Sequence, residues 1–137
     1  MKRIGAHYLY INPDILLKNG VVEIDDNGVV TDYFSLNDVN VESSNTEFYT
    51  GFLAPAFFPK TIIHEATATS PHELKEIALR LWNMQQEFPN ATIVDFLKFE
   101  SVSIEKDKQT EIWLFENVNL VDLKITPETT VDSLLFM

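Results

Sequence analysis

The sequence predicts an α+β fold in which β-strands from both ends of the chain flank two helices. Apolar residues repeat with period two in the first 58 residues and after residue 101, whereas residues 70–100 show the helical period. Strands and helices do not alternate along the chain, so a parallel sheet built from βαβ units is not expected. With 137 residues the chain has the usual size of one domain, and we interpret 1–137 as a single domain.

The N-terminal part predicts a series of strands. Residues 3–11 (RIGAHYLYI) are rich in aromatic and β-branched side chains, which favour strands. Asn27 and Gly28 suit the positive φ angles of a tight hairpin turn that joins the next two strands. Residues 46–57 (TEFYTGFLAPAF) alternate well enough to form another strand. We therefore expect a β-meander over the first 57 residues.

The middle of the chain predicts two helices. Ser70 is suited to the N-cap, Pro71 to the first helical position, and Glu73 completes a capping box. Pro89 ends the first helix, and a shorter second helix is expected around 92–99. The apolar stripe of the first helix consists of Leu74, Ile77, Ala78, Leu81, Met84 and Phe88.

The C-terminal part returns to the strand period. The stretches SVSIE, TEIWLFENV and VDSLLF predict strands, and a turn is expected at 106–109 (KDKQ). We expect these strands, which occupy 101–137, to pair with the strands of 1–58.

Charge and composition argue against nucleic acids and membranes as partners. The net charge of −11 and a pI near 4.5 oppose binding to nucleic acid and to anionic membranes, both of which require clustered Lys and Arg. No apolar run approaches the ~20 residues of a membrane span, and the first ten residues lack the apolar region of a signal peptide. The chain contains no Cys. We expect a cytoplasmic protein that needs no cofactor and contacts neither nucleic acid nor membrane.

Several segments resemble the motifs of a known family, and they occur in the same order along the chain. KNGVVEI, which begins at Lys18, and GFLAPAF, which begins at Gly51, are similar to "K-N-G-x-V-x-I" and "G-x-L-x-P-G-F". SIEKDKQTEIWLF, which begins at Ser103, is similar to "G-S-I-E-x-G-K-x-A-D-L-x-L-I". Together they resemble the two ends of an amidohydrolase-superfamily enzyme, a metal-dependent hydrolase of the chlorohydrolase and cytosine-deaminase type.

This resemblance implies a composite β-sandwich domain, built from both chain ends, without the catalytic TIM barrel. A (β/α)8 barrel needs about 250 residues, and the space between the two halves of this chain is far too short for one. The family's two metal-binding histidines would align with Thr61 and Ile63, so both ligand positions are vacated. The resemblance therefore implies a non-catalytic protein with neither catalytic nor metal-binding residues.

Residual metal chemistry would have to use other residues. His64, Glu65 and His72 lie close together in the sequence and could in principle form a rebuilt site for a metal-dependent hydrolase. His72 is, however, expected in the first turn of a helix, where side chains are usually solvated. We interpret His7 as a half-buried strand histidine.

The remaining functional hypotheses concern binding. Loss of the barrel is expected to uncover apolar surface at Phe57 and Phe58. Helical phase places Trp82 at the margin of the core stripe and Leu79 well outside it. These four residues predict a contact with a second copy, as a homodimer, or with a full-length amidohydrolase paralogue. The alternative is a small-ligand binding module on the same vacated surface. Its wall would use Tyr8, Tyr10, Tyr33, Tyr49 and Trp113.

Overall fold

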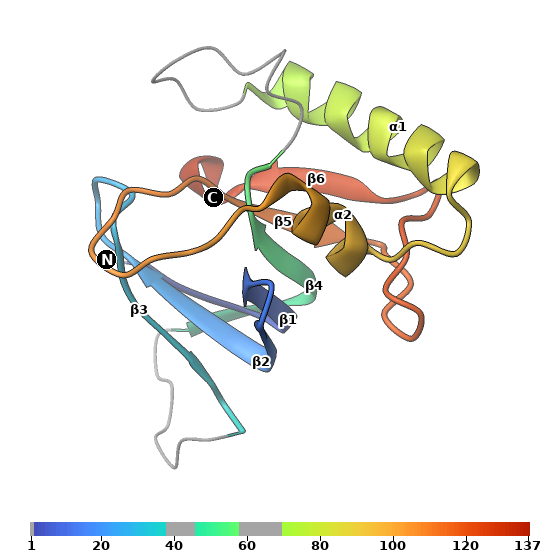
Figure 1. Ribbon diagram of the computed structural model, residues 1–137. Coiled ribbons are helices and arrows are strands. Elements are labelled where there is room, and N and C mark those ends of the chain that lie inside the picture. The colour runs from blue at the N-terminus through green and yellow to red at the C-terminus, as the bar shows by residue number, and fades with distance from the viewer. Residues whose placement is uncertain (1, 38–45, 58–69) are drawn as a thin grey trace.

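The computed structural model describes residues 2–37, 46–57 and 70–137, and they form an α+β fold (Figure 1). A single six-stranded sheet, two α-helices and one short 3-10 helix account for its regular structure. The strands are β1 (Lys2–Asn12), β2 (Ile15–Ile24), β3 (Val30–Ser35), β4 (Thr46–Pro55), β5 (Ile112–Glu116) and β6 (Thr130–Ser133). The helices are α1 (Pro71–Glu87), α2 (Ile93–Glu100) and the short 3-10 helix η1 (Leu134–Phe136).

Strands from both ends of the chain lie in this sheet, as the sequence predicted. The strand order is β3-β2-β1-β4-β5-β6, and β4 pairs antiparallel with β5 so that Gly51 lies opposite Glu116 and Pro55 opposite Ile112. This pairing joins the N-terminal and C-terminal strands. No closed parallel barrel is present in the described part of the chain.

The predicted β-meander is correct for the first three strands and wrong for the fourth. β1, β2 and β3 pair antiparallel in sequence order, but β4 pairs in parallel with β1, on the side of β1 away from β2. The chain after β3 therefore passes β2 and β1 and adds β4 on the far side of β1, instead of pairing β4 with β3. This placement puts β4 in the middle of the sheet, where it can bridge to β5.

The predicted turn at Gly28 and the predicted Ser70 cap are confirmed, but Asn27 does not adopt positive φ, and the Glu73 carboxylate accepts from the Ser70 hydroxyl instead of completing a reciprocal capping box. Gly28 has φ 79°, and the Asp25 carboxylate accepts hydrogen bonds from the amides of Asn27 and Val29 at 2.8 and 3.0 Å. The Ser70 hydroxyl caps α1 by accepting from the amide of Glu73. Thr92 caps α2, with Asp95 completing a reciprocal capping box. Each cap satisfies amides that the first helical turn leaves unpaired, so these residue types position both helix starts.

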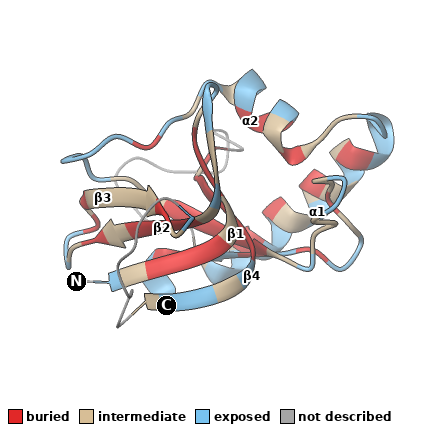
Figure 2. Ribbon diagram, turned by 90° about the horizontal axis from the view of Figure 1, so that it is seen from below, coloured by how far each residue is buried: buried red, intermediate tan, exposed pale blue. Residues whose placement is uncertain are grey.

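The sheet has a hydrophobic cluster on each face. One cluster lies beneath the two helices and contains the buried side chains of Leu74, Ile77, Leu81, Phe96 and Leu97. The opposite cluster contains side chains of β1 to β5, and it is closed by Ile104 and by Leu134 of η1. Figure 2 shows that buried residues line β1 and recur along one side of α1. The arrangement is thus layered, with the sheet in the middle.

One predicted strand is replaced by an extended loop. Residues 102–105 form no ladder, although the amide of Ile104 donates to the carbonyl of Ile11 at 2.7 Å and the Ile104 side chain is buried. Ser101 ends α2 in the left-handed conformation with φ 55°, and the chain then crosses the second face of the sheet. The alternating pattern reflects burial of Ile104 and not strand pairing. Neither helix in the described part of the chain has the length and apolar character that a membrane span requires.

Candidate functional site

The outer flank of α1 carries the exposed apolar surface that helical phase predicted. Leu79 is 61% exposed, whereas Trp82, one turn along the helix, is half-buried. The core-facing stripe of α1 instead contains Leu74, Ile77 and Leu81. Leu79 and Trp82 therefore lie at the rim between the buried side of the helix and solvent.

A groove lies between this flank and β6, the outermost strand on that side of the sheet. It encloses about 480 Å³. Trp82, Ala78 and Leu79 form the helix wall, and the opposite wall comes from Pro127 and from 129–132. Exposed Lys75 and Asp132 provide one charge of each sign at the groove. Sequence reasoning identified the helix wall but missed the strand wall, because the proximity of β6 to α1 depends on the tertiary arrangement.

The expectation that Phe57 is exposed is wrong. Phe57 is 3% exposed and packs against the rings of Trp113 and Phe115, with centroid distances of 5.6 and 6.1 Å. The amide of Ala56 donates to the carbonyl of Glu111 at 2.9 Å, which continues the β4–β5 pairing and directs the chain over the aromatic cluster. Phe58, Thr61 and Ile63 lie outside the described residues.

The five aromatic residues proposed as the wall of a ligand site do not share one surface. Tyr8, Tyr10 and Trp113 pack with the cluster beneath the helices, whereas Tyr33 and Tyr49 pack with the cluster on the opposite face. Tyr10 and Trp113 are fully buried. Burial, followed by the charge of Asp14, raises the pKa of the Tyr10 hydroxyl. Because the sheet separates the two groups, they cannot form one pocket wall.

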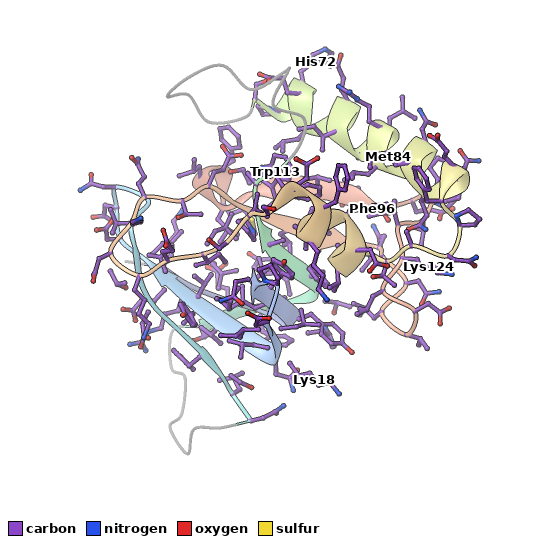
Figure 3. The ribbon with its side chains drawn as sticks, viewed as in Figure 1. Lys18, His72, Met84, Phe96, Trp113 and Lys124 are labelled. Atoms are coloured by element: carbon purple, nitrogen blue, oxygen red, sulfur yellow. The ribbon has the colours of Figure 1, made fainter. Side chains whose placement is uncertain are left out.

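The histidines within the described residues occupy separate places. His72 is at the exposed start of α1, with Nε2 3.2 Å from a carboxylate oxygen of Glu76, and Figure 3 shows it apart from the other labelled residues. His7 is half-buried on β1, as expected, and its ring meets the edge of Phe48 at a centroid distance of 5.4 Å. His64 and Glu65 lie outside the described residues. Among the residues that are described, no three His, Asp or Glu side chains are placed to hold a metal ion together.

A polar cluster around Glu23 has a structural role. The Glu23 carboxylate accepts from the Thr31 hydroxyl and from Arg3 Nε, each at 2.7 Å. These two hydrogen bonds, with the Arg3 charge as a smaller contribution, lower the pKa of Glu23. The cluster ties β1, β2 and β3 together at the sheet surface. It stabilises a carboxylate and supplies no activated nucleophile or base.

Comparisons with known proteins give no further indication of function. The sequence matches no protein-family model, and no curated protein resembles it at a significant level.

Proposed function

We propose that this chain is a non-catalytic, amidohydrolase-like protein that acts through protein contact, and that it forms a homodimer through the groove between α1 and β6. Exposed Leu79 beside Trp82, on the wall of a groove of about 480 Å³, is the observation that carries the proposal. Large exposed apolar patches are uncommon on stable monomers and are typical of interaction sites.

The arrangement of charges supports self-association. Lys75 and Asp132 line the same groove, so a two-fold pairing can bring the lysine of one copy toward the aspartate of the other. The net charge of −11 opposes association, but salt screens repulsion beyond about 8 Å at physiological ionic strength. Apolar burial acts at contact distance and is not an interaction between charges, so salt does not screen it. We expect an interface of more than about 1,000 Å² in total.

The amidohydrolase-like part of the proposal rests on the sequence motifs, and the fold is compatible with it. A sheet built from both chain ends, joined by β4 and β5, fits a sandwich-like composite domain. The side chain of Ile63, at one of the two aligned ligand positions, has no atom that can bind a metal ion, which favours a non-catalytic role. A full-length amidohydrolase paralogue would be the alternative occupant of the same groove.

Matched substitutions test the proposal. Leu79→Glu places a charge in the groove and should convert a dimer into a monomer with an unchanged circular dichroism spectrum. Val121→Glu is the control, because Val121 is 91% exposed in the loop after β5, away from the groove. It should leave the dimer intact. Equal sedimentation of the two variants would contradict the assignment of the interface.

A further inference from the structure

A second hollow lies at the other end of the two helices. It encloses about 300 Å³ between the last turn of α1 and the side of α2. Its floor is formed by Phe57 and Phe96, which are buried, and Met84 contributes from α1. Figure 3 shows Met84 and Phe96 on neighbouring helices above the sheet. None of these residues lines the groove beside β6, so the two surfaces are distinct.

Two exposed aromatic side chains extend the apolar surface beyond the hollow. Phe88 is 52% exposed and Phe99 is 86% exposed, and both line it. A small molecule enclosed by the hollow would leave much of Phe99 in water. A helical segment that lies across the rings of Phe88 and Phe99 would cover both. Such segments usually bind in grooves through apolar side chains spaced at i, i+3, i+4 and i+7.

The backbone around the hollow is held in place by hydrogen bonds. The amide of Phe88 donates to the carbonyl of Met84 at 2.8 Å, and the Phe88 carbonyl accepts from the Gln85 side chain at 3.1 Å. On α2, the Asp95 carboxylate accepts from the amide of Thr92 at 2.9 Å. The surface is thus preorganised, which lowers the entropy that a partner must lose on binding.

The charges at the hollow have one sign. Asp95 and Glu100 line it, and no Lys or Arg does so among the described residues. The chain as a whole carries a net charge of −11, which attracts basic partners over a longer range. A second copy would bring its own carboxylates against these, and like charges across a contact oppose pairing.

We infer that the Phe88–Phe99 groove, defined by Phe57, Met84, Phe88, Asp95, Phe96, Phe99 and Glu100, binds a basic amphipathic helix of a partner protein. Its apolar face covers Phe88 and Phe99, and its Lys or Arg side chains meet Asp95 and Glu100. This inference goes beyond the proposed homodimer, because it assigns a different surface and a partner of opposite charge.

The test uses a fluorescent 18-residue peptide with Leu at i, i+3, i+4 and i+7 positions and Lys elsewhere. We expect saturable binding by fluorescence anisotropy, and roughly tenfold weaker binding to Phe99→Ser, because central aromatic contacts dominate such interfaces. Val121→Ser, which removes an exposed apolar residue elsewhere, should bind as the wild type does. Neither substitution changes the charge, so the comparison isolates the apolar contact.

The rim charges are tested by a second matched pair. Glu100→Gln should weaken binding and reduce its dependence on salt, whereas Glu128→Gln, at an exposed position outside the groove, should have a smaller effect. The inference is overturned if the peptide does not bind, if a Leu-Glu peptide binds equally well, or if Phe99→Ser binds normally. It is also overturned if Phe99→Ser converts a dimer into a monomer, because a second copy would then be the occupant. If the wild type is a monomer and binds the basic peptide at Phe99, the homodimer proposal is refuted but the inference about the Phe88–Phe99 groove is not.

Discussion

Replacement of Gln85 by Leu should destabilise the protein by about 2 to 4 kcal/mol. Gln85 is buried on the core side of α1. Its amide nitrogen donates to the carbonyls of Phe88 and Ala91 at 3.1 and 2.8 Å, and its oxygen accepts from the amide of Ile125 at 3.0 Å. One side chain thus ties the end of α1 to the α1–α2 turn and to the segment before β6.

The magnitude follows from these three hydrogen bonds. Each contributes about 1 kcal/mol net, and an amide left unpaired in a buried position costs about 1 to 3 kcal/mol. Ile125 is buried, so its amide has little access to water in the Gln85→Leu variant. Leu has a similar volume, so no large cavity adds to the cost.

Urea denaturation of Gln85→Leu and Gln86→Leu provides the assay. Gln86 is the neighbouring, exposed position on the same helix, and its substitution should change the free energy of unfolding by no more than about 0.5 kcal/mol. If the two variants unfold within about 0.5 kcal/mol of each other, the hydrogen-bond reasoning is refuted.

Two further predictions concern the sheet. Because the pKa of Glu23 is lowered in the folded state, its stabilisation is present above the ordinary value of 4.5 and is lost as pH falls through the lower folded value. Glu23→Gln should therefore be less stable than the wild type at neutral pH, with a smaller loss of stability on acidification; parallel pH profiles would count against this. Gly51→Ala should cost about 1 to 3 kcal/mol, because an added Cβ would overlap the carbonyl oxygen of Phe115 across the β4–β5 pair. A Gly51→Ala variant as stable as the wild type would argue against the β4–β5 register.

Local features of the fold were predictable because they depend on neighbouring residues. The Ser70 cap and the positive φ of Gly28 each depend on residues within a few positions. The parallel pairing of β4 with β1 was not predictable in this way, because alternation specifies the faces of a strand and not its neighbour. For the same reason the buried, alternating Ile104 suggested a strand where the structure has an extended loop.

At the candidate surfaces, too, local features were predictable and features that depend on tertiary contacts were not. Helical phase correctly placed Leu79 outside the core stripe of α1. Phe88 was assigned to that stripe, but it is the C-cap residue, where the backbone leaves helical geometry and turns the side chain outward. Phe57 was expected at the surface, yet the adjacent aromatic rings of β5 bury it. The signal that could have identified the second groove was Phe99, which lies outside the stripe of Ile93, Phe96 and Leu97.

Sedimentation velocity of the wild-type chain at micromolar concentration in moderate salt shows whether the protein is a dimer. We expect a species of twice the 15.7 kDa chain mass, which Leu79→Glu and Trp82→Glu convert to a monomer without loss of helix content. A wild-type chain that sediments as a 15.7 kDa monomer throughout this range would contradict the claim that the groove between α1 and β6 is a homodimer interface.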